Sequence, residues 1–153
     1  MKEAWRLYIS PLASGAWNMA VDESILEHVA RDDAIPTLRL YSWEPPCLSL
    51  GRSQPFSDVN KNALKTNGWD VVRRMTGGRA ILHTDELTYS IIAPNDNLHV
   101  NGSILDSYRH LAQGLLAALK SLGADVAMNK EKAEQSTRTN PVCFETPSAY
   151  EIT

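Results

Sequence analysis

Arginine, glycine and histidine residues come together in the segment 71–92, within a stretch whose other residues suit β-strands. A guanidinium group binds carboxylates and phosphates through a planar fork of donors. A glycine lets a ligand approach the backbone because it has no side chain, and a histidine can move a proton near neutral pH. The pattern therefore favours a small-molecule site. The residues that form it are Arg73, Arg74, Thr76, Gly77, Gly78 and His83.

The same residues also have plain structural interpretations. A Gly-Gly pair between two strands is typical of a hairpin turn. Arg73 and Arg74 are neighbours, and neighbouring strand residues point to opposite faces, so at most one of them reaches a given pocket. Either arginine equally suits a solvated strand end, and His83 equally suits a half-buried strand position.

A second candidate for chemistry is Cys143, in the segment "VCFETPSAYEIT". A cysteine attacks carbonyl carbon as a thiolate, and its ordinary pKa near 8.5 leaves only a few per cent of the thiol ionised at neutral pH. A basic or cationic neighbour must therefore assist it, and His83 is a candidate. The structural alternative is that Cys143 is a small apolar residue beside Phe144. Cys47, inside "CLSL", is expected in the core.

The composition restricts the class of protein. A chain of 153 residues that is 43% hydrophobic fits one domain with a real core. Its 15 basic and 18 acidic residues are mixed along the sequence, which is unlike the basic surface of a nucleic-acid-binding protein. No apolar run approaches the roughly 20 residues of a membrane span, and the N-terminus lacks a secretory signal. We therefore expect a cytoplasmic protein with no nucleic-acid or membrane partner, and the spacing of histidines and cysteines predicts no metal site.

The elements that would position these residues alternate between strands and helices. Strand patterns cover 5–10, 37–43, 47–52, 69–74, 79–83 and 87–93, and the prolines of "EPP" make a hairpin or a strand corner between the second and third. A short polar helix should end at Gly68. Longer helices are expected over 17–30 and 104–122, packed by their apolar stripes, with Gly123 as a stop. The inward stripe of the first comprises Trp17, Ala20, Val21, Ser24, Ile25, His28 and Val29, and that of the second Leu105, Tyr108, Leu111, Leu115, Leu119 and Leu122.

Four segments together resemble a known family. They are "NMAVDESIL", "TLRLYSWEPPCLSLGRSQ", "VVRRMTGGRAILHTDELTYSI" and "CFETPSAYEI". The series is similar to the lipoate-protein ligase A and octanoyltransferase family, which has the biotin/lipoate-protein ligase catalytic fold. The resemblance implies an α/β fold with a mixed sheet flanked by helices. It also implies that the Arg-Arg-x-Thr-Gly-Gly motif lines the slot for an octanoyl or lipoyl chain, with Arg73, Thr76, Gly77, Gly78 and His83 near its carbonyl end.

Details of the motif favour one branch of that family. ATP-using ligases usually carry a third glycine where this chain has Arg79, and a His-Asp followed by Gly-Asn where it has "HTDELTYS". These departures resemble the cysteine-dependent octanoyltransferases of the LipM type, in which Cys143 matches the nucleophile. The resemblance implies transfer of octanoyl from acyl carrier protein, through a Cys143 thioester, to a lysine of a lipoyl-domain protein such as the glycine cleavage H protein. It implies no ATP and no metal.

Two other functions remain open from the sequence. An ATP-dependent lipoate-protein ligase would use ATP and Mg²⁺ to form an acyl-adenylate, and a non-catalytic module would bind an acyl group or a lipoyl domain without turnover. Family members continue past "YEIT" into a segment that supplies a carbonyl-holding lysine, and no lysine here matches it. We therefore expect residues 1–153 to be the N-terminal part of a single catalytic domain, truncated at its C-terminus.

Overall fold

A computed structural model describes residues 4–128 and 152 of the chain. Cys143 and most of the segment around it lie outside the described residues. The described chain falls into two compact units, one up to Ala93 and one beginning at Pro94. Each unit is treated by itself below.

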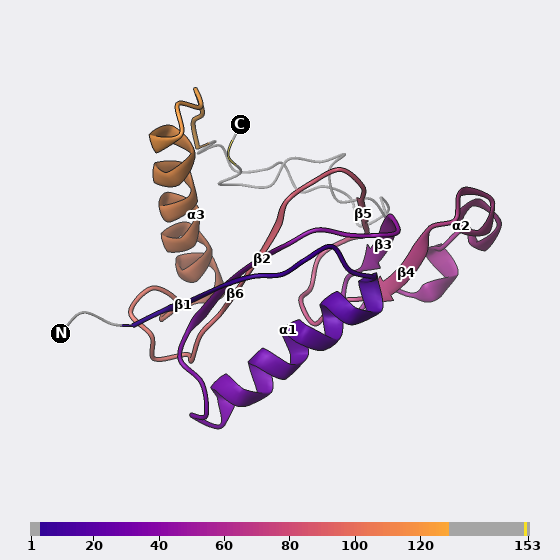
Figure 1. The fold of residues 1–153 in the computed structure, drawn as a ribbon. Helices are drawn as coiled ribbons and strands as arrows, with labels where there is room; N and C mark the ends of the chain where they lie inside the picture. Colours follow the sequence, from indigo (N-terminus) through magenta and orange to yellow (C-terminus); the bar gives the residue numbers. More distant parts are fainter. Residues whose placement is uncertain (1–3, 129–151, 153) are drawn as a thin grey trace. The chain divides into compact units, whose positions relative to one another are not determined.

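The first unit is built from short strands and two helices (Figure 1). Its strands form two separate three-stranded sheets, in the orders β1-β2-β6 and β4-β3-β5, and each sheet has one parallel and one antiparallel pairing. The expected α/β fold with mixed strand pairing and helices is therefore confirmed, although the strands form two sheets where one mixed sheet was expected. The elements are β1 (Arg6–Ile9), α1 (Gly15–Ala30), β2 (Thr37–Tyr41), β3 (Cys47–Leu50), the 3₁₀ turn η1 (Phe56–Asp58), α2 (Lys61–Asn67), β4 (Asp70–Arg73), β5 (Ile81–His83) and β6 (Thr88–Ile92).

The proline segment after β2 moves the chain from one sheet to the other. β2 is the central strand of the first sheet and β3 is the central strand of the second, so these two strands do not pair with each other. Of the two alternatives for "EPP", the strand corner is confirmed. The carbonyl of Pro46 accepts a hydrogen bond from Asp70 N (2.9 Å), which aligns β4 beside β3 at this corner.

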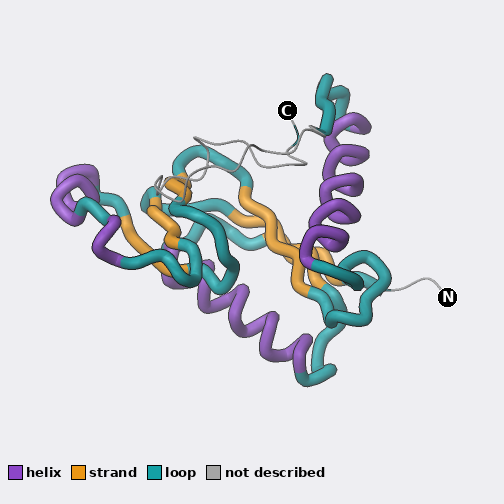
Figure 2. The backbone as a smooth tube through the Cα atoms, turned by 180° about the vertical axis from the view of Figure 1, so that it is seen from behind, coloured by secondary structure: helices purple, strands orange, loops and turns teal. Residues whose placement is uncertain are grey.

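Helix α1 runs beside the first sheet (Figures 1 and 2) and is fixed by polar as well as apolar contacts. Ile25 and Val29 pack against Ile92 of β6 as expected. Val21 is half-buried against the same cluster, also as expected. The prediction is wrong for Trp17, which is 61% exposed, and for Ala20, Ser24 and His28, which are exposed as well. Asn18 is fully buried in their place.

Part of the inward face of α1 is polar because it must accommodate Arg39. This β2 residue is completely buried. Its Nη1 donates to Asp22 Oδ1 (2.8 Å) and to the Asn18 carbonyl (2.9 Å), and its Nη2 donates to Asn18 Oδ1 (2.7 Å). Its Nε donates to Ser10 Oγ (2.9 Å), and the guanidinium lies 4.0 Å from the centroid of the Tyr41 ring. A buried charge is tolerated only when it is paired and hydrogen-bonded, so α1 presents acceptors here instead of an apolar stripe.

Replacing Asp22 with alanine should strongly destabilise the first unit. Asp22 accepts hydrogen bonds from Arg39, Tyr41 (3.1 Å) and Ser90 (2.9 Å), so its loss leaves the buried Arg39 without its anionic partner. The free energy of unfolding in urea should fall by about 3 kcal/mol. Glu27→Ala is the control, because the Arg31–Glu27 pair (3.5 Å) is exposed and such pairs contribute little. Equal effects of the two substitutions would show that the Arg39 network does not hold α1.

The smaller helix α2 has a capping residue at each end. The side chain of Asn60 accepts a hydrogen bond from Ala63 N (3.0 Å) at the start of the helix. Gly68 ends it in the left-handed conformation, with a φ of 67° that disfavours other residues. The predicted stop at Gly68 is confirmed.

The second unit contains α3 (Ile104–Ser121). Ser103 and Asp106 form a capping box at its start, and Gly123 follows its end with a φ of 87°. The helix matches the predicted range of 104–122 within a residue at its end. The apolar residues predicted to face inward from this helix are less buried than expected, since Leu105 is 47% exposed and Leu122 is 83% exposed.

No helix among the described residues is long and apolar enough to cross a membrane.

Candidate functional site

The Gly-Gly segment connects two strands that do not pair with each other. β4 is parallel to β3 on one edge of the second sheet, and β5 is antiparallel to β3 on the other edge. Residues 74–80 therefore cross from one edge to the other at the end of β3, and the hairpin interpretation of the glycine pair is wrong. We call residues 74–80 the crossing loop.

The crossing loop touches the backbone at the end of β3. The Arg52 amide donates to the Thr76 carbonyl (2.9 Å), and the Arg74 amide donates to the Leu50 carbonyl (3.0 Å). A Cβ atom on Gly51 would lie only 1.9 Å from the Gly78 carbonyl oxygen. Only glycine fits at position 51, because that distance is far inside van der Waals contact. Sequence reasoning missed Gly51, although its place directly after an apolar strand was a usable signal.

The two arginines bind different partners, in agreement with the expectation that neighbours on a strand point apart. Nη1 of Arg73 donates to the carbonyls of Gly51 (2.8 Å), Arg52 (3.2 Å) and Gln54 (2.6 Å). Arg73 was expected near the acyl head group. In the structure its guanidinium holds the segment that follows β3.

Arg74 organises the crossing loop from inside. Its Nη1 donates to Ser49 O (2.8 Å) and Ser49 Oγ (2.9 Å). Its Nη2 donates to the carbonyls of Gly77 (3.2 Å) and Arg79 (2.6 Å). One guanidinium thus ties the central strand to both sides of the glycine pair. Which of the two arginines would do this could not be predicted from local sequence.

The two glycines of the loop differ in their surroundings. Thr76, Gly77 and Gly78 are all exposed. Gly78 has a φ of 93°, and a Cβ there would lie 3.1 Å from Arg74 Nη2. A Cβ on Gly77 would meet no atom within 4 Å. The chain can therefore tolerate a side chain at Gly77, and the bare backbone there is available for an external group to lie against.

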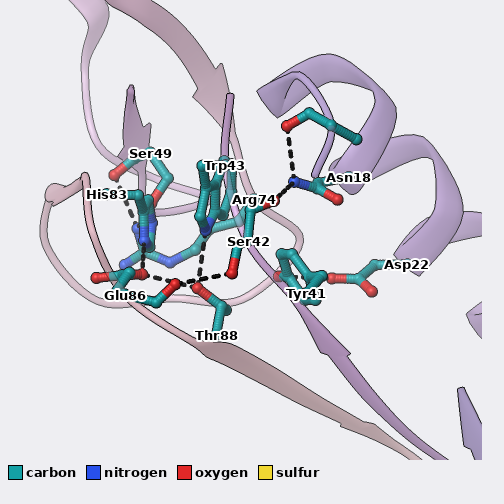
Figure 3. A network of polar contacts seen from close by, with 11 residues as sticks. Asn18, Asp22, Tyr41, Ser42, Trp43, Ser49, Arg74, His83, Glu86 and Thr88 are labelled. Carbon is teal, nitrogen blue, oxygen red and sulfur yellow. Dashed lines mark hydrogen bonds and ion pairs between the residues drawn. The ribbon is translucent and has the colours of Figure 1, made fainter. Parts of the chain in front are cut away.

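His83 is buried in β5 and has partners on both ring nitrogens (Figure 3). Its Nε2 lies 2.7 Å from Ser49 Oγ, and its Nδ1 is hydrogen-bonded to Glu86 Oε1. The ring stacks on Trp43 with centroids 4.1 Å apart. Thr88 Oγ1 donates to Glu86 Oε1 (2.7 Å) and accepts from Trp43 Nε1 (2.7 Å), which closes the network. The half-buried strand position considered for His83 is close to what the structure shows, with a denser set of partners.

Sequence reasoning missed Ser49, Glu86, Trp43 and Thr88. Glu86 had a usable signal, because it follows His83 by three residues. Ser49 had a weaker one, as the polar residue in the apolar strand "CLSL". Trp43 and Thr88 come from different segments, and nothing local connects them.

Cys47 is a core residue, as expected. It is fully buried beside Tyr41 and Trp43. Burial, and secondarily the charge of Asp70, raise the pKa of its thiol to about 12, which leaves it protonated at neutral pH. Cys47 is therefore a poor nucleophile. Cys143, the expected nucleophile, lies outside the described residues.

Comparison with known proteins identifies the family. The model of the lipoyl protein ligase A/B catalytic domain matches residues 14–145, which is most of the chain. The chain belongs to the lipoyl protein ligase A/B catalytic-domain family. This confirms the relationship inferred from the Arg-Arg-x-Thr-Gly-Gly motif.

Relatives within the lipoyl protein ligase A/B family carry the octanoyltransferase name. The octanoyltransferase LipM of Moorella thermoacetica is 43% identical over 153 residues, which cover 99% of this chain and 56% of that protein. The chain thus spans little more than half the length of the curated relatives that it matches.

Solved structures share the fold. A putative lipoate protein ligase from T. acidophilum with bound lipoic acid has a TM-score of 0.73 at 23% identity, over 97% of this chain and 57% of that one. A bipartite lipoate protein ligase from Thermoplasma acidophilum, described together with its E2 lipoyl domain, has a TM-score of 0.67 at 23% identity, over 86% and 51%. At this level of identity the likeness shows the fold alone.

Proposed function

We propose that this protein is an octanoyltransferase of protein lipoylation. The observation that carries the proposal is the 43% identity with a LipM octanoyltransferase over 99% of the chain. The departures of Arg79 and "HTDELTYS" from the ligase pattern support the same branch. We take residues 1–153 to be the N-terminal part of one catalytic domain.

In the proposed reaction, Cys143 carries the octanoyl group between two proteins. Its thiolate attacks the thioester carbonyl of octanoyl-acyl carrier protein, a new carbon–sulfur bond forms, and the carrier's thiol leaves as it takes up a proton. The amine of a lysine on a lipoyl domain then attacks the Cys143 thioester, an amide forms, and the Cys143 thiol is released. Both steps start from an activated thioester, so neither needs ATP or a metal.

The crossing loop is proposed to receive the head of the octanoyl chain. Gly77 offers open backbone, and Thr76 and Gly78 flank it on the exposed side of the loop. Arg73 would contribute by holding the 51–54 segment against which the loop rests. His83 would shape the site and would not act as the base for Cys143, because both its ring nitrogens already bind Ser49 and Glu86.

The proposed acceptor is a lipoyl-domain protein such as the glycine cleavage H protein. The pairing of a related ligase with an E2 lipoyl domain in T. acidophilum supports a lipoyl domain as the acceptor class. The proposed location is the cytoplasm, as predicted from the sequence.

The competing enzyme function is an ATP-dependent lipoate-protein ligase, whose fold this chain shares. Three incubations of the protein as encoded, each with a lipoyl domain, separate the possibilities. The first contains octanoyl-acyl carrier protein, the second octanoate with ATP and Mg²⁺, and the third octanoate alone. We expect octanoylation of the lipoyl domain, read by mass spectrometry, only in the first. Modification only in the second would establish the ligase, and binding of the octanoyl donor without any transfer would establish a non-catalytic module.

A further inference from the structure

A continuous series of hydrogen bonds runs from Glu86 to the crossing loop (Figure 3). Glu86 binds His83, His83 binds Ser49, and Ser49 binds Arg74. Arg74 in turn holds the carbonyls of Gly77 and Arg79 on both sides of Gly78. The conformation of the exposed glycine pair therefore depends on the buried Ser49 and His83 and, through them, on the half-buried Glu86.

The donors and acceptors in this series have a definite direction. A guanidinium can only donate, so Ser49 Oγ accepts from Arg74. The Glu86 carboxylate is an acceptor, so the hydrogen on His83 Nδ1 is donated to it; in the neutral imidazole Nε2 is then an acceptor, and it takes the hydroxyl hydrogen of Ser49. The Glu86 carboxylate thus selects the Nδ1–H tautomer of His83. Thr88 holds the Glu86 carboxylate in place through a hydrogen bond, and the Trp43 ring holds the His83 imidazole in place by stacking on it.

The order serine, histidine, carboxylate is also that of a hydrolase nucleophile and its helpers. Ser49 cannot serve as one while it stays as the structure shows it, because its side chain is completely buried. Its hydroxyl is moreover bound by Arg74 on one side and His83 on the other. The series is arranged to support the loop and not to attack a substrate.

We propose that Glu86 is a positioning residue that sets the conformation of the crossing loop through His83, Ser49 and Arg74. Because the loop is proposed to receive the octanoyl head group, the effect of Glu86 on activity rests on the octanoyltransferase function. Its effect on the loop itself does not. Removing the carboxylate frees the imidazole to change tautomer and rotate, which withdraws the acceptor for the Ser49 hydroxyl and loosens the hold of Arg74 on Gly77.

The test compares Glu86→Ala, Glu86→Gln and Asp85→Ala in the protein as encoded. Asp85→Ala is the matched control, because it removes an exposed carboxylate of the same charge one residue away. In Glu86→Ala, amide hydrogen exchange at residues 77–79 should accelerate about tenfold, and the ¹⁵N shifts of His83 should leave the Nδ1–H pattern. The KM for octanoyl-acyl carrier protein should rise about tenfold with a much smaller change in kcat. Glu86→Gln should recover most of each effect, because its amide oxygen still accepts from Nδ1–H.

The outcomes distinguish the two proposals. Unchanged loop exchange and an unchanged His83 tautomer in Glu86→Ala would overturn the positioning role, whatever the activity. Altered loop exchange in a protein whose unsubstituted form transfers no octanoyl group would overturn the octanoyltransferase and leave the positioning role standing. Labelling of Ser49 by a fluorophosphonate probe would show that the serine is an accessible nucleophile, and that result would also overturn the supporting role given to the series.

Discussion

Gly51→Ala should abolish most octanoyl transfer while leaving a folded protein. The added Cβ would lie 1.9 Å from the Gly78 carbonyl oxygen, which is backbone and cannot rotate away. The crossing loop must therefore shift by an ångström or more. A displacement of that size at a binding site can lower the rate about a hundredfold, and overpacking of this kind costs about 1–3 kcal/mol of stability. The measurements are the rate of lipoyl-domain octanoylation and the urea unfolding curve.

Gly77→Val separates the shape of the loop from the space above it. A side chain at Gly77 meets no atom of the chain within 4 Å, so the free energy of unfolding should hardly change. Octanoyl binding should nonetheless weaken, because the side chain would occupy the space proposed for the acyl chain. If Gly77→Val left transfer intact, the octanoyl chain would not lie there, and the large effect of Gly51→Ala would need another cause.

Local features of the fold could be predicted because each depends on residues close together in the sequence. Gly68 and Gly123 end helices where only a left-handed residue fits, and their positions after periodic segments predicted this. The break between strands at "EPP" follows from two prolines that cannot continue a strand, although the prolines alone left a hairpin and a strand corner open. The family resemblance added the fold as a whole, since its motifs extend over most of the chain.

Non-local pairings could not be predicted from the same patterns. The alternation of apolar and polar residues predicts that Arg39 lies on a strand. It does not predict the Asp22 and Asn18 acceptors that allow Arg39 to be buried. The apolar spacing of α1 wrongly predicted Trp17 as an inward residue, because spacing within a helix does not show which residues of the sheet the helix will contact. The helix face that turns toward the sheet depends on the side chains of the sheet, and the charge of Arg39 requires the polar residues Asp22 and Asn18 there.

The candidate site shows the same division. The glycine pair could be singled out from its residue types, but its place in a crossing at the end of β3 depends on strand order, which local sequence does not encode. His83 and Ser49 are 34 residues apart and meet only because β5 pairs with β3. Glu86 was within reach of sequence reasoning, since it lies three residues from His83 and carries the natural partner for an imidazole.

Cys143→Ser should eliminate the acyl-enzyme. Incubated with octanoyl-acyl carrier protein and no acceptor, the unsubstituted protein should gain one octanoyl group that hydroxylamine removes, as expected of a thioester. A serine hydroxyl is almost wholly protonated at neutral pH, so transfer should fall about a thousandfold or more, the scale seen when a covalent nucleophile is lost. Intact-mass spectra before and after hydroxylamine give the stoichiometry and the bond type.

Cys47→Ser is the matched control, because it makes the same atomic change at the other cysteine. The Cys47 thiol is fully buried and its pKa is raised to about 12, so it should neither attack the donor nor receive the octanoyl group by thioester exchange. Its replacement should leave acylation unchanged and lower stability by no more than about 1–3 kcal/mol, because a buried hydroxyl needs a partner.

If octanoyl transfer survived Cys143→Ser and required ATP, the acyl group would be activated as an adenylate and the ligase would be the correct function. If transfer survived without ATP, the donor thioester would be attacked directly by the acceptor lysine, and the crossing loop would then serve to hold the octanoyl chain and not a covalent intermediate.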